Sequence, residues 1–186
     1  MMKKAAVVVL IALLLTGCSG QSKEMERTLK LRTKLLSSSC SFDADISADY
    51  GDKLHTFSLQ CQADAQGNVS FTVLKPDSIA SISGAVDGED GKLTFGDVAL
   101  HFPLLADQQV TPVSAPWLLL KTLRAGYITS AGAAKEYLRV SIDDSYADNA
   151  LHTDIWLDSS DTPVKAEILY RERKILSLDV KNFRIE

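Results

Sequence analysis

The chain lacks the residue patterns that catalysis or nucleotide binding requires. Its three histidines, His55, His101 and His152, occur singly, and none has a cysteine or carboxylate partner at metal-ligand spacing. There is no Gly-x-Ser-x-Gly nucleophile motif and no Gly-x-x-x-x-Gly-Lys phosphate loop. We therefore expect no enzyme activity, no cofactor and no resident metal.

Basic residues are also too few for a nucleic-acid partner. The chain has 20 Lys and Arg against 24 Asp and Glu, a net charge of −4. Without residues 1–17, which hold Lys3 and Lys4, the charge is −6. Nucleic acids and anionic lipid head groups both attract basic surfaces. The composition argues against nucleic-acid binding and requires any lipid contact to be apolar.

Long hydrophobic runs are absent after the first 15 residues. The one apolar run, Ala5 to Leu15, has 11 residues and follows the two lysines. A run of about 10–14 residues is too short to cross a bilayer and is typical of a signal peptide. The run ends at Leu15-Thr16-Gly17-Cys18, where small residues precede a cysteine.

This segment resembles the bacterial lipobox. The resemblance implies that residues 1–17 are a lipoprotein signal peptide and that Cys18 is lipidated, for example with palmitate. Residues 18–23 would then tether a single domain, 24–186, to the extracytoplasmic face of the cell membrane. Several acyl chains on one cysteine give near-permanent anchoring. The alternative is an ordinary secretory signal with a coincidental cysteine.

The two remaining cysteines lie in neighbouring strand patterns. Apolar residues alternate with polar ones over 40–49 and again over 55–62. A hairpin that turns at Tyr50-Gly51 would place Cys40 opposite Cys61 on the apolar face. Because exported chains favour disulfides, we expect a Cys40–Cys61 bridge. Two buried free thiols are the alternative.

Two segments have helical patterns. The first, about Lys23 to Ser37, follows the candidate N-cap Ser22 and has an apolar stripe of Met25, Leu29 and Leu36, widened by Leu31 and Leu35. Its basic residues face either solvent or the membrane. The second starts at the candidate N-cap Ser114 and stops at Gly126. It is apolar around most of its circumference, so it is either buried core or a lid over a cavity.

Short strand patterns fill the rest of the chain. They are separated by turn residues at intervals of about 8–12, which is typical of an all-antiparallel sheet. Two acidic turns, Asp87/Glu89/Asp90 and Asp143/Asp144/Asp148, are interpreted as solvated turns rather than calcium sites.

The order of these patterns resembles the LolA/LolB-like lipoprotein-carrier superfamily. A lipobox is followed by an amphipathic helix, the strands Phe42-Asp43-Ala44-Asp45-Ile46 and Val69 to Pro76, a Pro-containing loop, an apolar helix and closing strands. The similarity covers about residues 24–186. It implies a mainly β fold with α, a curved antiparallel sheet or incomplete β-barrel covered by helices around an apolar cavity. It also implies a non-enzymatic protein. The arginine that the carriers have in an early strand is absent from Ser39 to Leu74.

Two functions follow from this fold. In the first, a membrane-anchored protein holds a lipophilic ligand, a lipid or the acyl chain of a lipoprotein, in the cavity. In the second, the interior is filled and the protein is a non-catalytic interaction scaffold for an envelope protein. For the first, the candidate ligand-binding residues are Phe42, Ile46, Phe57, Leu59, Val69, Phe71, Val73 and Phe95 of the sheet and Trp117, Leu120 and Leu123 of the helix.

Overall fold

A computed structural model describes residues 23–49, 51, 53–87, 90–95, 98–103, 105–106 and 109–186. The predicted signal peptide, the predicted lipidation site Cys18 and most of the predicted tether lie outside these residues. Two α-helices are described, α2 (Lys23–Ser37) and α3 (Ala115–Ala125), with one-turn 3-10 helices η1 (Asp77–Ile79) and η2 (Pro112–Ser114). Neither α-helix has the length and apolar character that spanning a bilayer needs.

An 11-stranded antiparallel sheet forms the body of the molecule, in the order β6-β5-β4-β3-β2-β1-β13-β12-β11-β10-β9. The strands β7 (Leu105–Ala106) and β8 (Gln109–Val110) form a separate hairpin. The bounds of the sheet strands are β1 (Cys40–Asp49), β2 (Leu54–Ala63), β3 (Val69–Lys75), β4 (Ser83–Asp87), β5 (Asp90–Phe95), β6 (Val98–Pro103), β9 (Tyr127–Ala134), β10 (Tyr137–Asp143), β11 (Leu151–Leu157), β12 (Pro163–Tyr170) and β13 (Arg173–Ile185).

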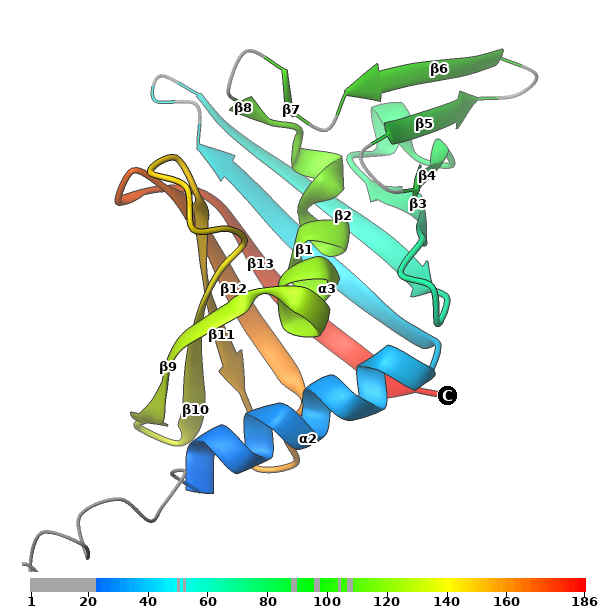
Figure 1. Ribbon diagram of the computed structural model, residues 1–186. Coiled ribbons are helices and arrows are strands. Elements are labelled where there is room, and N and C mark those ends of the chain that lie inside the picture. Colours follow the sequence, from blue (N-terminus) through cyan, green and yellow to red (C-terminus); the bar gives the residue numbers. More distant parts are fainter. Residues whose placement is uncertain are drawn as a thin grey trace, which may run out of the picture.

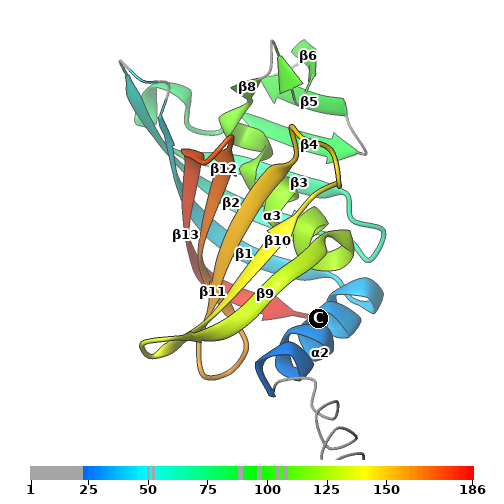
Figure 2. The same cartoon turned by 60° about the vertical axis from the view of Figure 1, so that its left-hand side comes forward.

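The sheet curves around α3, which lies against its concave face (Figure 1). α2 crosses one end of the curved sheet, and β4, β5 and β6 form an arm at the other end (Figures 1 and 2). Alternating apolar residues of β1 are buried toward α3, and their polar neighbours lie on the convex face. The predicted fold class, a curved antiparallel sheet or incomplete barrel covered by helices, is confirmed.

Arginines of α2 join it to the rest of the molecule. Arg32 donates from Nε to the Leu123 carbonyl (2.7 Å) and from Nη2 to the Gly126 carbonyl (2.8 Å). These carbonyls lie at the C-terminus of α3, where the last carbonyls of a helix lack partners. Arg27 forms an ion pair with Asp161 (2.6 Å) in the turn between β11 and β12. α2 therefore caps α3 and closes the end of the sheet.

The helix bounds predicted from the sequence are confirmed, but some details are wrong. Thr28, Leu31 and Leu35 form the buried line of α2, whereas Leu36 is exposed. Ser114 precedes α3 but does not cap it, because its hydroxyl donates to the Thr111 carbonyl instead. The strand β9 was not predicted, because its small residues lack a clear alternation.

Candidate functional site

The predicted ligand-binding residues mostly lie together in one core between the sheet and α3. Phe57 packs against this core and is partly buried, and the side chain of Phe95 lies outside the described part. The other nine are buried: Phe42, Ile46, Leu59, Val69, Phe71, Val73, Trp117, Leu120 and Leu123.

Around these nine residues the space between sheet and helix is filled. The six on the sheet are each at most 3% exposed. Residues that line an open cavity retain accessible surface, so these side chains contact one another and α3 directly. Leu118 and Leu119 are buried as well, which places apolar residues around most of the circumference of α3 in the core. In this structure α3 occupies the concave face.

The concave apolar surface continues past α3 onto the arm. Directly paired residues of an antiparallel sheet share a face, and Phe71 pairs with Gly84, Gly84 with Leu93 and Leu93 with Leu100. Leu93 is partly buried, but Val98 and Leu100 are 61% and 64% exposed. We call Leu93, Val98 and Leu100 the apolar strip. It extends the core to a surface that the described residues leave open.

The cysteines do not lie as predicted. Cys40 pairs with Ala63, and Cys61 pairs with Phe42, so the register is displaced by two residues. The cause is the turn, because Asp49 pairs with Leu54 and the loop is 50–53 rather than two residues. Both thiols are buried and free. Burial raises the pKa of the Cys40 thiol to about 11 and raises that of Cys61 further, so neither is a reactive thiolate.

Arg124 is a buried cation that sequence reasoning missed. Its Nη2 donates to the carbonyls of Asp64 (2.7 Å) and Ser38 (3.2 Å), which joins the C-terminus of α3 to two loops. Its Nε and Nη1 are buried, without a hydrogen-bond partner in the described part of the chain. A methyl group at Gly67 would lie 2.9 Å from Nη1, so the glycine leaves room for the guanidinium.

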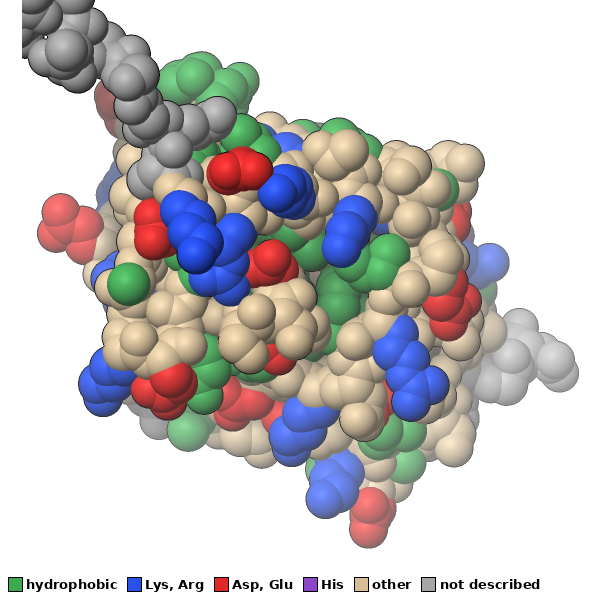
Figure 3. Space-filling model, turned by 90° about the horizontal axis from the view of Figure 1, so that it is seen from below, with side chains coloured by type: hydrophobic (Ala, Val, Ile, Leu, Met, Phe, Trp, Pro, Cys, Tyr) green, Lys and Arg blue, Asp and Glu red, His purple; other side chains and the backbone are tan. Residues whose placement is uncertain are grey.

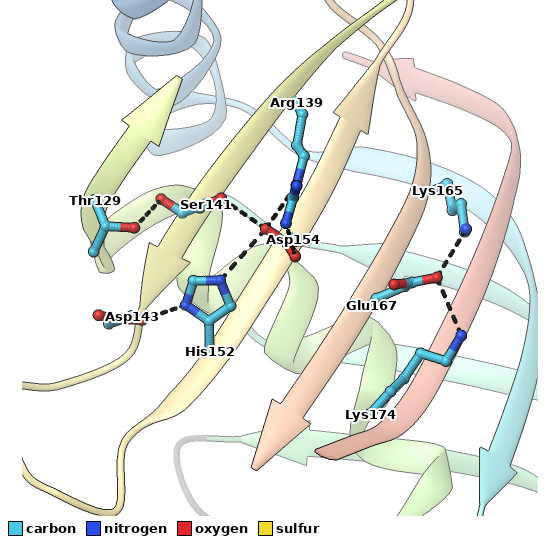
Figure 4. Close-up of polar contacts among 9 residues, drawn as sticks. All are labelled: Thr129, Arg139, Ser141, Asp143, His152, Asp154, Lys165, Glu167 and Lys174. Atoms are coloured by element: carbon cyan, nitrogen blue, oxygen red, sulfur yellow. Dashed lines mark hydrogen bonds and ion pairs between the residues drawn. The ribbon is translucent and has the colours of Figure 1, made fainter. Parts of the chain in front are cut away.

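The convex face carries a polar network on β9 to β13 (Figure 4). Asp154, only 4% exposed, accepts hydrogen bonds from Arg139 Nε (3.1 Å) and Ser141 Oγ (2.7 Å). His152 lies between Asp143 (2.6 Å from Nδ1) and Asp154 (3.4 Å from Nε2). Burial raises the pKa of Asp154, but hydrogen bonds from Arg139 and Ser141 and nearby positive charge outweigh it and lower the pKa.

This network has no nucleophile–base pair. Ser141 donates to the carboxylate of Asp154 and not to His152, so the imidazole does not activate the hydroxyl. Glu167 binds Lys165 (2.8 Å) and Lys174 (3.3 Å) in the same way, as an ion cluster on the sheet surface (Figure 4). No group of metal-binding side chains occurs among the residues that the structure describes. The network joins side chains of neighbouring strands, as the hydrogen bond from Ser141 of β10 to Asp154 of β11 illustrates.

Hollows on the outside of the sheet differ in polarity. One, of about 450 Å³, has a mostly apolar lining that includes Tyr137, Trp156 and Val164. Another, of about 370 Å³, lies where the outward residues of β2 to β5 meet. Its lining includes Gln60, Gln62, Ser70, Thr72, Ser83 and Lys92. Amide, hydroxyl and amine groups suit polar ligands better than acyl chains. The apolar strip is therefore a better candidate for a lipophilic contact than this polar hollow.

The end of the molecule on which α2 lies carries charges of both signs (Figure 3). Lys30 pairs with Glu26 (2.8 Å) and Arg27 with Asp161. The basic residues of α2 are thus partly neutralised, and this face is not a uniformly basic surface for anionic lipid.

Comparison with known proteins finds no matching family model and no matching curated protein. Several solved structures are similar. One is an uncharacterized conserved protein from Thermus thermophilus, at 12% identity and a TM-score of 0.48 over 87% of this chain and 86% of that one. Another is a LolA superfamily protein from Nitrosomonas europaea, at 10% identity and 0.44 over 86% and 93%.

A third similar structure is the Mycobacterium tuberculosis lipoprotein LppX, at 15% identity and a TM-score of 0.42 over 86% of this chain and 92% of that one. These similarities concern the course of the backbone. The curved sheet around a helix is observed in the structure directly.

Proposed function

We propose that this chain is a non-catalytic lipoprotein of the bacterial envelope that binds a lipophilic ligand on the concave face of its sheet. Residues 1–17 would be removed, Cys18 lipidated, and the domain 24–186 held at the extracytoplasmic face of the membrane by residues 18–23. The ligand is a lipid or the acyl chain of a lipoprotein.

The apolar strip carries this proposal. Val98 and Leu100 lie on the same face as the core residues, yet they are exposed. An acyl chain laid along them would bury apolar surface at roughly 25 cal/mol per Å². A ligand that reaches the deeper residues, such as Phe71, Val73 and Trp117, would also require α3 to move away from the sheet.

The test compares two exposed leucines on opposite faces. Leu100→Glu introduces charge on the strip, and Leu54→Glu introduces it at a residue that is 67% exposed on the convex face. Because neither side chain is in the core, both variants should fold. We expect Leu100→Glu to reduce uptake of a fluorescent fatty acid at least tenfold, and Leu54→Glu to leave it unchanged. Equal uptake by both variants and the wild type would exclude the strip as the binding site.

Native mass spectrometry of the domain with Cys18 replaced gives an independent test. Co-purified species of fatty-acid or phospholipid mass, released on denaturation, would support the proposal. A clean apo mass in wild type and variants would count against it.

A second candidate is the interaction scaffold with a filled interior. The near-complete burial of Ile46, Leu59 and Leu120 favours it, because no rearrangement of α3 is then needed. Purification from membranes separates the two functions. A stoichiometric envelope protein and no extractable lipid would support the scaffold.

The anchor is tested separately. We expect Cys18→Ser to abolish palmitate labelling and to shift the protein from the membrane fraction to the soluble fraction. Labelling that persists in this variant would contradict the assignment of Cys18.

A further inference from the structure

The mostly apolar hollow on the outside of the sheet lies at the end where α2 begins. Arg27 of α2 donates to the Asp161 carboxylate (2.6 Å) in the turn between β11 and β12. Trp156 lies near the end of β11, just before this turn, and Val164 lies at the start of β12, just after it. Tyr137 is the first residue of β10, and the preceding strand β9 packs against α2. The hollow and the start of α2 are therefore neighbours (Figure 1).

The start of α2 is also the point that the anchor holds near the membrane, and in this respect the inference rests on the proposed function. Residues 18–22 would join the lipidated Cys18 to Lys23. Five residues span at most about 17 Å when fully extended. Arg27 follows Lys23 by four residues, about 6 Å along the helix axis. The hollow is thus kept close to the bilayer, whereas the arm of β4, β5 and β6 lies at the other end of the molecule (Figure 1).

The lining of the hollow resembles the residues that proteins place at a membrane–water interface. It has a volume of about 450 Å³, and its two aromatic residues, Tyr137 and Trp156, are half-buried. Tryptophan and tyrosine are enriched at this depth because each combines an apolar ring with a polar group. A lysine suits the same depth, since its methylene groups lie against apolar surface while its amine reaches water. Lys165 has its Nζ 4.7 Å from the centre of the Trp156 ring.

The rim of the hollow carries charges of both signs. Lys135 and Lys165 contribute amines, and Glu136 and Asp179 contribute carboxylates. A zwitterionic phospholipid head group has a phosphate for the amines and an ammonium for the carboxylates and the aromatic rings. An anionic head group would be repelled by the carboxylates and by the net negative charge of the chain. Charge complementarity therefore favours a zwitterionic lipid.

We propose that this hollow binds zwitterionic head groups of the membrane that holds the anchor. Its apolar surface is small, so we expect weak binding to lipid by the unanchored domain. The tether raises the local concentration of head groups, which allows a weak site to be occupied. Docking at the α2 end directs the arm and its apolar strip away from this bilayer. The ligand of the strip would then arrive from the aqueous side.

Tryptophan quenching by brominated lipid measures the contact, because bromine quenches only at short range. The chain has two tryptophans, and Trp117 is 7% exposed in the core. The chain from residue 18 onward, which includes every described helix and strand, is made without lipid and coupled through Cys18 to a maleimide phospholipid in vesicles. Cys40 and Cys61 are buried and should not react. This anchor does not depend on lipidation in the cell.

The vesicles consist of phosphatidylcholine with brominated acyl chains. We expect the emission of the wild type to be quenched and that of Trp156→Phe, which retains only Trp117, to be unaffected. Val164→Glu places charge in the hollow and should reduce the quenching at least threefold. The control is Leu54→Glu, at a residue that is 67% exposed on the same face at the other end of β2, and it should match the wild type.

A second variant tests the rim without altering the apolar lining. Lys135 is an exposed turn residue, so Lys135→Glu should fold normally and weaken the quenching. Replacement of part of the phosphatidylcholine by anionic phosphatidylglycerol should lower the quenching of the wild type. A coupled wild type without quenching overturns the proposal and leaves the hollow to a soluble occupant. Equal quenching in the wild type, Val164→Glu and Lys135→Glu also overturns it, and quenching that requires phosphatidylglycerol excludes the zwitterionic head group.

Failure of the proposed function gives a different result. If Cys18 is not lipidated in the cell, palmitate labelling is absent, but the chemically coupled chain should still dock. If Leu100→Glu retains uptake of fatty acid, the apolar strip is not the binding site, and this variant should be quenched by brominated lipid as the wild type is.

Discussion

At the scale of single residues, the buried carboxylate on the convex face forms hydrogen bonds and ion pairs with its neighbours. Asp154 lies in the middle of a sheet face, yet Arg139, Ser141 and His152 surround its carboxylate. Its pKa is lowered in the folded protein, so the ionised form is stabilised by folding. This stability is present above the unfolded-state pKa, about 3.9, and is lost as the pH falls through the folded-state value.

We predict that Asp154→Asn lowers the free energy of unfolding at neutral pH by about 1–3 kcal/mol, because charged hydrogen bonds are lost from a buried site. The variant should also lose less stability than the wild type between about pH 5 and pH 3. Urea unfolding at a series of pH values measures both effects. Asp148→Asn, at an exposed loop residue, is the control and should match the wild type. If the stability of Asp154→Asn depends on pH in the same way as that of the wild type, the proposed role of the Asp154 carboxylate is wrong.

Gly84 is a second residue at which a single methyl group would disturb the packing. A methyl group there would clash with Phe71 Cζ and would lie 2.8 Å from the Lys92 carbonyl oxygen. We predict that Gly84→Ala costs about 1–3 kcal/mol of stability by overpacking. Phe71→Leu in the same chain should restore part of it, because the ring atom is removed. Gly132→Ala, where nothing lies within 4 Å, should be near neutral in the same thermal melts. Equal melting temperatures for the two alanine variants would be the contrary result.

At the scale of elements, α3 depends on α2 for its C-terminus. Arg32 satisfies the carbonyls of Leu123 and Gly126, and Thr122 bonds the Leu118 carbonyl within the helix. The helix positions were predictable from sequence, since the stop at Gly126 and the apolar run both indicate them. The cap was not predictable, because Arg32 and Leu123 are 91 residues apart in the chain.

We predict that Arg32→Ala destabilises the protein by about 1–3 kcal/mol and increases amide exchange in residues 115–126. Lys30→Ala removes only an exposed ion pair with Glu26 and should leave the free energy of unfolding nearly unchanged. Hydrogen-exchange mass spectrometry and urea unfolding compare the two variants. If the amides of α3 exchange at the same rate in both variants, the hydrogen bonds from Arg32 do not stabilise the helix.

At the scale of the whole molecule, the chain closes its sheet with its last strand. β13 lies between β1 and β12, so the first and last strands of the domain are neighbours. The Glu186 N–H also donates to the Ser39 carbonyl (2.9 Å). In the 11-stranded sheet, strands β1 to β6 are joined to strands β9 to β12 by pairing through β13.

We predict that deletion of Arg173 to Glu186 prevents folding, because it leaves two unpaired central edges and removes the buried Leu176, Leu178 and Val180. Circular dichroism and a thermal scan should show no cooperative transition. Deletion of Glu186 alone removes one hydrogen bond and should leave the transition in place. Cooperative unfolding of the longer deletion would contradict the central role of β13.

The sequence by itself determined which side chains face the core and where the helices begin and end. Period-two alternation identifies the buried face of β1 and β2, and apolar periodicity with Gly126 bounds α3. Only the tertiary structure decided the register. A shift of two residues leaves each side chain on the same face, so alternation cannot distinguish Cys40 opposite Cys61 from Cys40 opposite Ala63. The length of the 50–53 loop selects the second.

The tertiary structure also decided what fills the concave face. The apolar residues of α3 are compatible with a buried core and with a lid over a cavity. The sequence pattern alone does not distinguish these two arrangements. Val98 and Leu100 remain exposed. Arg32 and Arg124 donate hydrogen bonds to distant carbonyls and join the C-terminus of α3 to α2 and to the loop at Asp64. These contacts join residues 60 or more positions apart, so no local pattern of residues encodes them.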